Sequence, residues 1–398
     1  MKPVDPSALL CDLIAIPSLN PMGRSSLEPP FGEARLAAYL ERWFLAAGLA
    51  VERRSVAPGQ DNLLARLDGS ASAGQPERLI LFDAHMDTVP VDGMLIDPFC
   101  PAVRDGRVYG RGACDVKGGM AAMLTALARL STLPQAQRPT VVMACTVNEE
   151  NGFSGAEHLV AQLLARPGGL LPRKPDAVLV AEPTGLDVVV AHKGVVRWRC
   201  HTRGKAAHSS RPESGENAIY RMARALTAIE HYQSSIVAGL AAHALCGPAT
   251  ISVGMIQGGV SVNTVPDRCT IEIDRRLPPG ETPVSARAHL IDYLDEDAGL
   301  GFPLEHEPAY MSGPPLSDES NGPLADRLMA AVRQTRGVCQ RLGVPYATDA
   351  AFYSAAGIPA VVCGPGDLAQ AHTADEWIAV DQLQQAVEIY FHFLQDFA

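Results

Sequence analysis

Three apolar runs in the first half of the chain constrain its fold most strongly. They are LILFDA at 79–84, TVVMACTV at 140–147 and AVLVA at 177–181, and each has the length of a buried strand. Helical patterns accompany them at 34–48, which closes on Gly48 as a C-cap, and in the Ala-rich segment 118–132. Strands that alternate with helices predict an α/β domain with a doubly wound, mostly parallel sheet.

The pattern changes near residue 193. Strand-like runs at 194–204, 249–259 and 265–276 accompany one helix from Glu216 and another from Thr282 to about Leu294. The first pattern then returns in a helix at 322–334, an apolar run at 358–364 and a helix from Asp381. We therefore expect a discontinuous α/β domain at 1–192 and 312–398, with an α+β domain inserted at 193–311.

Composition excludes several classes of partner. The chain has 398 residues and a formal net charge of −11, which disfavours nucleic acid and anionic membranes because both need clustered cationic side chains. Its N-terminus lacks a signal-peptide pattern, and no apolar run reaches the roughly 18 residues of a membrane helix, so a cytoplasmic location is expected. Nine Cys without a C-x-x-C pair predict reduced thiols.

Two motifs place candidate metal ligands after the first apolar run. His85 and Asp87 in HMDTVP are two residues apart, so they can share one face, and a carboxylate beside an imidazole fixes its tautomer. The plainer alternative is that both merely cap a loop. Asp115 lies in the Gly-rich GRGACDVKGG, which lacks the G-K-[ST] ending of a phosphate-binding loop. A carboxylate in such a turn could bridge two cations.

The next two runs are also followed by acids. Glu149 and Glu150 in VNEENG point in different directions if the backbone is extended, so one can bind metal while the other faces substrate. An acidic pair is usually solvated surface, but this one ends an apolar run, and buried carboxylates repel each other unless a cation is near. Glu182 follows in AEPTG, and His372 lies in AQAHTADE. Imidazole and carboxylate donors suit a hydrolytic pair of Zn, Mn or Co ions about 3.5–4 Å apart.

These motifs, in this order, resemble the co-catalytic zinc aminoacylase/carboxypeptidase metallopeptidase family, which includes acetylornithine deacetylase, succinyl-diaminopimelate desuccinylase, aminoacylase and the glutamate carboxypeptidases. The resemblance covers essentially the whole chain. It implies a zinc-exopeptidase-like catalytic domain, an inserted lid and dimerisation domain, and two zinc ions, with Co or Mn as possible substitutes. The implied site residues are Asp115 as bridge, His85 and Glu182 at one zinc, Glu150 and His372 at the other, Glu149 as general base and Asp87 as the orienter of His85.

The resemblance has further implications. It implies a cis peptide between Asp115 and Val116. In the inserted domain, His208 of GKAAHSSRPESGENAI matches a residue that reaches the partner subunit's active site in dimeric members, where it helps to hold the oxyanion. Asn263 in GGVSVNTVP matches a substrate-side polar residue, and Arg276 in IDRRLPPG matches an arginine that receives the substrate carboxylate. Arg275 is adjacent to it, and the plainer alternative leaves both arginines solvated and His208 at a helix cap.

The implied function is hydrolysis of the amide bond of N-acyl amino acids by a zinc-activated water, with Glu149 as general base and a homodimer as the assembly. The alternative is a dipeptidase or carboxypeptidase of the same family. The segment 18–34, rich in Pro, Gly and Ser, is a candidate active-site rim that bears on this choice. One departure is Asn148, where the family commonly has Asp.

Two other mechanisms are less well supported. A serine or cysteine hydrolase would need a nucleophile motif, but G-x-S-x-G is absent and Cys114, beside Asp115, is better explained as packing. A non-enzymatic binding or scaffold protein predicts loss of the ligands or the base, and all of them are present.

Overall fold

The three apolar runs form neighbouring strands at the centre of a large sheet: β3 (Leu79–His85), β6 (Thr140–Thr146) and β7 (Ala177–Val180). β6 and β7 pair with β3 on its two sides, both in parallel. The computed structural model describes residues 3–24, 28–70 and 77–397, and every residue of these three strands is buried. Side chains on both faces of the sheet are therefore covered, as a doubly wound sheet requires.

The complete sheet has eight strands in the order β1-β2-β6-β3-β7-β17-β8-β16. β17 is parallel to β7, whereas the pairs β1–β2, β2–β6 and β17–β8 are antiparallel. Parallel strands thus form the centre, and antiparallel strands flank it. The remaining bounds are β1 (Ala50–Ala57), β2 (Gln60–Leu67), β8 (Val188–His192), β16 (Arg341–Val344) and β17 (Ala360–Val362).

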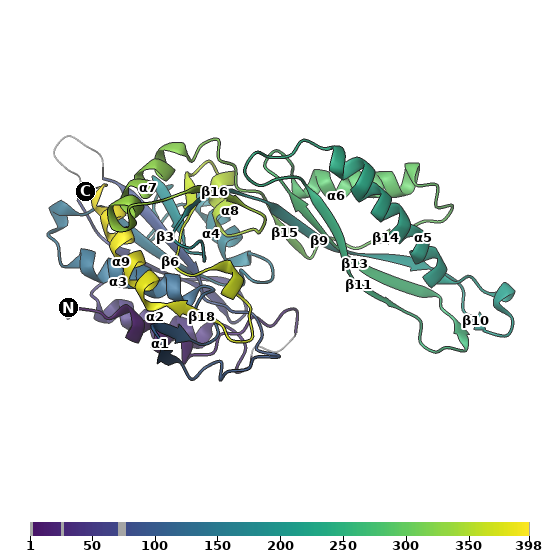
Figure 1. Ribbon diagram of the computed structural model, residues 1–398, viewed down its shortest axis with the longest axis horizontal. Helices are drawn as coiled ribbons and strands as arrows, with labels where there is room; N and C mark the ends of the chain where they lie inside the picture. Colours follow the sequence, from purple (N-terminus) through teal and green to yellow (C-terminus); the bar gives the residue numbers. More distant parts are fainter. Residues whose placement is uncertain (1–2, 25–27, 71–76, 398) are drawn as a thin grey trace. The chain divides into compact units, whose positions relative to one another are not determined.

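Helices pack on this sheet in two groups (Figure 1). One group contains α1 (Pro6–Ile14), α3 (Lys117–Ser131), α7 (Gly322–Arg336) and α9 (Val380–Gln395), which contact one another. The other contains α2 (Ala34–Ala46), α4 (Ser154–Ala165) and α8 (Ala350–Ala355). Gly48 follows the end of α2 with φ +77°, the left-handed conformation expected of the predicted helix stop.

A small three-stranded sheet joins distant parts of the chain. Its strands are β4 (Ala102–Arg104), β5 (Arg107–Tyr109) and β18 (Trp377–Ala379), in the order β18-β5-β4. Trp377 pairs with Tyr109, and the Gly110 nitrogen donates to the Glu376 backbone oxygen at 3.0 Å. This pairing brings the segment that follows His372 beside the turn that carries Asp115.

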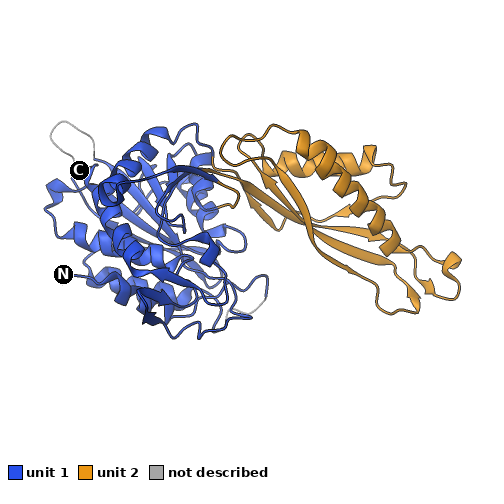
Figure 2. Cartoon of the chain, viewed as in Figure 1, with its two compact units in different colours: residues 1–190, 317–343, 348–398 blue, residues 191–316, 344–347 orange. Residues whose placement is uncertain are grey.

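A second compact unit consists of residues 191–316 and 344–347 (Figure 2). Its main sheet has the order β11-β13-β9-β14, built from β9 (Gly194–Arg203), β11 (Thr250–Gly258), β13 (Arg268–Leu277) and β14 (Glu305–His306), and β15 (Met311–Gly313) also pairs with β9. Buried and partly exposed residues alternate along β13, so one face of the sheet packs inward. This α+β unit spans residues 191–316, where the sequence pattern predicts an inserted domain at 193–311, and residues 344–347 also group with it. The Val344 oxygen accepts a hydrogen bond from the Lys193 nitrogen at 3.1 Å.

Two helices cover the buried face of that sheet. α5 (Ala218–His231) begins after Asn217, whose side chain accepts from the Tyr220 nitrogen, and α6 (Pro283–Asp292) begins after a Thr282–Ser285 capping box. The core between these helices and the sheet contains Trp198, Met222, Ile271 and Leu290. A short ribbon, β10 (Ala207–His208) with β12 (Thr264–Val265), completes the unit.

Each of the nine cysteines is a free thiol, and six of them are buried. In the part of the chain that the structure describes, no helix has both the length and the apolar character to cross a bilayer.

Candidate metal centre

The carboxyl ends of the central strands meet at one edge of the sheet. His85 is the last residue of β3 and pairs with Thr146, the last residue of β6, while Glu182 follows the end of β7 closely. Polar residues that follow parallel strands therefore converge, which is where open α/β sheets place their sites. This arrangement explains why three motifs separated by many residues contribute to one centre.

Five of the predicted residues form two groups that share Asp115. The ligand atoms of His85, Asp115 and Glu182 lie within 4.8 Å of one another, and so do those of Asp115, Glu150 and His372. Asp115 Oδ1 lies 3.2 Å from His85 Nε2, and its Oδ2 lies 3.2 Å from His372 Nε2. The two oxygens of one carboxylate thus face different histidines, which is the geometry of a bridging ligand.

The donors in these groups fit a pair of divalent cations. Glu150 Oε1 and Glu182 Oε1 are buried atoms without a hydrogen-bond partner, a costly state that a cation would relieve. The donor set of imidazole and carboxylate, without thiolate, suits zinc and its neighbours. Cys114 is buried, and its Sγ lies 3.3 Å from the Asp367 backbone oxygen, which supports packing rather than ligation.

Asp87 contacts two glutamates of the site in addition to His85. The His85 Nδ1 atom lies 2.9 Å from the backbone oxygen of Asp87 and 3.5 Å from its carboxylate Oδ1. The carboxylate itself accepts hydrogen bonds from the backbone nitrogens of Glu149 and Glu150, each at 3.1 Å. Asp87 therefore connects the end of β3 to the turn that carries both glutamates, and its main-chain oxygen makes the closer contact with the imidazole.

Glu149 is buried in an acidic surrounding. Burial raises its pKa well above the ordinary value, the charge of His85 opposes this shift, and the charges of Glu182 and Asp349 add to it. A carboxylate with a raised pKa holds a proton more strongly, which suits a group that must accept one near neutral pH.

Asp115 differs from the other acids of the site. Burial alone would raise its pKa, but hydrogen bonds from His372 and His85 hold the pKa well below the ordinary value. The bridging position is therefore occupied by an anion across the physiological pH range, as a metal ligand requires.

Glu376 is a buried residue of the site that sequence reasoning missed. Its Oε1 accepts from the backbone nitrogens of Cys114 and Asp115 at 2.9 and 3.0 Å, and its Oε2 accepts from the Gly112 nitrogen and the Arg111 guanidinium at 3.1 and 2.6 Å. Four donors thus fix the turn that carries Asp115. The peptide bond between Asp115 and Val116 is cis, as predicted.

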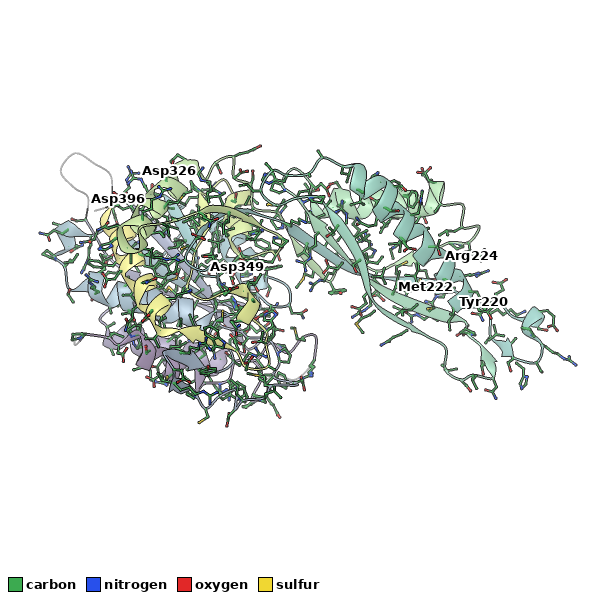
Figure 3. All side chains as sticks on the ribbon, in the orientation of Figure 1. Tyr220, Met222, Arg224, Asp326, Asp349 and Asp396 are labelled. Carbon is green, nitrogen blue, oxygen red and sulfur yellow. The ribbon has the colours of Figure 1, made fainter. Side chains whose placement is uncertain are left out.

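A second pair of buried acids consists of Asp83, two residues before the end of β3, and Asp349, directly before α8. Asp83 accepts hydrogen bonds from the Tyr353 hydroxyl at 2.6 Å and from the Thr146 hydroxyl at 2.9 Å, while Asp349 Oδ2 also lies 2.9 Å from that threonine oxygen. Figure 3 labels Asp349 in the first unit. One hydroxyl donates only one hydrogen, so the second contact needs a protonated carboxyl group. Burial raises the pKa of Asp349 well above its ordinary value, which favours Asp349 as the group that holds the proton.

In the second unit, the structure brings His208 and Asn263 together. His208 pairs with Thr264 in the short ribbon, and the Asn263 backbone oxygen accepts from the Ser209 nitrogen at 3.0 Å. His208 is exposed, and its Nδ1 accepts from the Ser210 nitrogen at 3.2 Å. The Ser210 hydroxyl oxygen lies 2.7 Å from the same nitrogen, so Ser210 fixes one edge of the exposed ring.

Arg276 lies in the main sheet of the second unit, at the end away from the β10–β12 ribbon that carries His208. Arg276 pairs with Val195 near one end of the β9–β13 pairing. At the other end, which is nearer His208 in the sequence, Arg268 pairs with Arg203. At about 3.3 Å per residue, the strand from Val195 to Arg203 alone spans about 26 Å. Within one chain, Arg276 is therefore far from both His208 and Asn263, as Figure 1 shows for β10 and for β15, which pairs with the first residues of β9.

The two neighbouring arginines have different surroundings. Arg275 has a side chain that is only 1% exposed, and its guanidinium donates to Glu281 at 2.8 Å and to the Arg276 backbone oxygen at 2.6 Å. The Arg276 side chain is 28% exposed and is held by Asp274 through Nε at 2.8 Å and Nη2 at 3.3 Å. Of the two arginines, therefore, only Arg276 has a side chain that is partly exposed.

Protein freed of metal should lose thermal stability as pH rises from about 5 to 9. Burial raises the pKa of Glu150 to about 7 from 4.5, so between these values the folded state holds a proton that the unfolded state has released, and stability falls with pH. Asp115 and Glu150 raise the pKa of His372 to about 10 from 6.5. The protonated His372 therefore stabilises the folded state fully below pH 6.5, and this stabilisation is lost as the pH rises to about 10.

Melting temperatures of chelator-treated protein across this range measure the effect. Zinc-loaded protein is the control, and it should show a weaker dependence because a bound cation keeps Glu150 ionised. A melting temperature of the metal-free protein that stayed constant or rose with pH would contradict this description of the site.

Comparison with known proteins agrees with this geometry. A sequence model of peptidase family M20/M25/M40 matches residues 81–396. Acetylornithine deacetylase of Vibrio campbellii is 31% identical over 375 residues, which cover 92% of each chain. Among solved structures, a metallo-carboxypeptidase of Sulfolobus solfataricus has a TM-score of 0.78 at 19% identity and covers 99% of each chain. A dinuclear metal-binding peptidase of Bacillus subtilis has a TM-score of 0.67 at 17% identity and covers 98% of this chain and 97% of its own.

Proposed function

The chain belongs to peptidase family M20/M25/M40 and is a metal-dependent amide hydrolase, and from this premise we propose that it removes the acyl group of N-acyl amino acids, as an acetylornithine deacetylase does. The observation that carries the proposed chemistry is Asp115, whose two oxygens face His85 and His372 beside the buried Glu149. The deacylase is favoured over a dipeptidase or carboxypeptidase because the relative with 31% identity over nearly its whole length is a deacetylase. The two peptidases of known structure that are compared above share 19% and 17% identity with this chain, which supports the fold alone.

We assign two zinc ions to the two groups of ligands, with Asp115 as the shared ligand. When bound, such ions lower the pKa of a water molecule and polarise the carbonyl of the scissile amide. Glu149 accepts the proton of the attacking water and returns it to the nitrogen of the leaving amine, so that the carbon–nitrogen bond breaks with release of a carboxylate and a free amine. Asp87 and Glu376 hold the turns on which Glu149 and Asp115 lie.

Arg276 is proposed to bind the free carboxylate of the substrate. Replacing Arg276 by alanine should lower kcat/KM about 10- to 100-fold, since a hydrogen bond to a charged group contributes about 1.5–3 kcal/mol. Lysine at this position should restore only part of the loss because it lacks the planar fork of a guanidinium. Arg275→Lys is the matched control, since the buried Arg275 does not face solvent. Steady-state kinetics measures the effect. Equal losses of kcat/KM in Arg276→Ala and in Arg275→Lys would refute the choice of Arg276.

We propose a homodimer in which His208 serves the active site of the partner subunit. Arg276 and His208 of one chain lie too far apart to contact one amino-acid-sized substrate, because most of the length of β9 separates Arg276 from the ribbon that carries His208. If both act on the same molecule, they come from different chains. β11 supports this assembly because it is the edge strand of its sheet, and its exposed side chains include Met255 and Ile256.

A mixing experiment distinguishes the two placements of His208. Chains with Glu149→Gln and chains with His208→Ala should each be inactive, yet mixed dimers should recover up to about a quarter of wild-type turnover, because half of the dimers are mixed and each has one complete site. If His208 acted within its own chain, every site would lack one group and mixing would restore nothing.

The substrate proposal is tested by release of free amine from N-acetyl, N-succinyl and N-formyl amino acids and from dipeptides, with zinc and with a chelator. Chelator-sensitive turnover confined to acylated amino acids is the expected result, and it identifies the acyl group. Turnover of dipeptides alone would favour the peptidase alternative. Turnover that resists the chelator would contradict a two-metal mechanism.

A further inference from the structure

Asn20 is a fully buried residue at the start of the segment 18–34, and its side chain connects that segment to the metal centre. Its Nδ2 donates to Asp87 Oδ2 at 2.8 Å and to Asn148 Oδ1 at 2.9 Å. Its Oδ1 accepts from the Met22 nitrogen at 2.8 Å, and its backbone nitrogen donates to the Thr88 oxygen at 2.7 Å. Residues 25–27 of this segment lie outside the part of the chain that the structure describes.

These contacts allow the side-chain amide of Asn20 only one orientation. The amide nitrogen has two hydrogens, and each has an acceptor, while the amide oxygen receives a backbone N–H. If the amide turned over, its oxygen would face the oxygens of Asp87 and Asn148, and its nitrogen would face the Met22 N–H. All three contacts would then be lost inside the protein, where unpaired polar groups are costly.

Both acceptors of Asn20 hold the turn that carries the proposed base. Asp87 accepts from the backbone nitrogens of Glu149 and Glu150, as described above. Asn148 directly precedes Glu149 and has φ +57°, a conformation that asparagine adopts more readily than most residues. Asn20 thus contacts the turn directly through Asn148 and indirectly through Asp87.

Asn148 is itself well held. Its Nδ2 donates to Ser154 Oγ at 2.9 Å, and its backbone nitrogen donates to Glu33 Oε1 at 3.1 Å. Glu33 and Asp87 are buried carboxyl groups close to one another, and burial followed by the charge of Asp87 raises the pKa of Glu33 to about 7. An aspartate at 148 would add a third acid here, so the neutral Asn20–Asn148 pair suits the surroundings in this chain.

We propose that Asn20 is a positioning residue that sets the place of Glu149 and Glu150 and so links the rim segment to the proton transfer. The proposal rests on the proposed function of Glu149 as base. Asn20 has no hydrogen bond to the five proposed metal ligands through its side chain, so its effect acts through Asp87 and Asn148. Its loss should therefore lower kcat more than it changes KM.

The test compares Asn20→Ala and Asn20→Asp with Ser18→Ala. Ser18 is a matched control because it is buried in the same segment and its Oγ donates to the Met86 backbone oxygen at 2.7 Å without contacting Asp87 or Asn148. We expect Asn20→Ala to lower kcat about 10- to 100-fold with KM little changed, as for other residues that orient the ligands of a metal site. Asn20→Asp, which keeps the volume, should lose more because it places a second carboxylate against Asp87.

A second readout needs no substrate. The visible absorption of cobalt bound in place of zinc reports the geometry of its ligands, which include Glu150, and it should change in both Asn20 variants but not in Ser18→Ala. The proposal is refuted if the Asn20 variants keep wild-type kcat and cobalt spectra, or if Ser18→Ala loses kcat equally. Wild-type turnover of the substrate panel tests the proposed function separately, so the two failures are distinguishable.

Discussion

Glu149→Gln should abolish most turnover while leaving the metal ions bound. The amide keeps the size of the side chain but cannot accept the proton of the attacking water, and general-base catalysis of this kind contributes about 10²- to 10⁴-fold. Metal should remain because Glu149 belongs to neither of the two groups of ligand atoms, which are centred on Asp115. The kcat of the variant and its zinc content, determined on the same sample, measure both parts of the prediction.

Glu150→Gln is the matched control for this variant. It changes the adjacent residue in the same way, yet Glu150 lies in the group with Asp115 and His372, so zinc content should fall along with turnover. A Glu149→Gln protein with a near-normal rate would show that another group is the base. Loss of zinc from Glu149→Gln would instead place that residue among the ligands.

Asp115→Asn should release metal from both sites. Each oxygen of the Asp115 carboxylate faces a different histidine at 3.2 Å, so one substitution removes an anionic ligand from both groups. A neutral amide offers one oxygen and no charge, and it cannot bridge two cations. After dialysis against a fixed low concentration of free zinc, we expect zinc content near zero and no measurable turnover.

His372→Ala provides the comparison for Asp115→Asn. His372 belongs to one group only, so its loss should leave the zinc that His85 and Glu182 hold. Equal zinc contents in the two variants, at about half the wild-type value, would mean that Asp115 serves a single ion and does not bridge.

Sequence patterns predicted the parts of the fold that depend on local periodicity. The strands 79–84, 140–147 and 177–181 appear as β3, β6 and β7 within one residue of their predicted ends. Alternating strands and helices impose a parallel sheet, and parallel strands place the residues after them at one edge. The convergence of His85, the two glutamates and Glu182 therefore followed from the pattern together with the resemblance to a family, which the match to M20/M25/M40 confirms.

Other parts of the site depend on contacts that no local pattern contains. Glu376 lies 261 residues after Asp115, and it reaches the turn only because β18 pairs with β5. Asn20 lies in a loop and contacts Asp87, 67 residues away. His372 has φ +61° in a loop, so its direction could not be inferred from a strand or helix period. The quoted sequence AQAHTADE contained Glu376, but a buried acceptor of four hydrogen bonds cannot be distinguished there from a solvated acid.

The choice between Arg275 and Arg276 rested on the resemblance to a family alone. Adjacent residues of a strand point to opposite faces, and Arg275 shares its face of β13 with the apolar Cys269, Ile271 and Ile273. The structure shows that Arg275 is the buried one, paired with Glu281. The assignment of Arg276 to the substrate remains a proposal that the kinetic comparison tests.

Anomalous X-ray diffraction at the zinc absorption edge, from crystals of the zinc-loaded enzyme, tests the central claim most directly. The bridged pair predicts two anomalous peaks in each chain about 3.5–4 Å apart, one bounded by His85, Asp115 and Glu182 and the other by Asp115, Glu150 and His372. A single peak at full zinc occupancy, or two peaks that do not share Asp115, would contradict the two-metal centre on which the proposed hydrolysis rests.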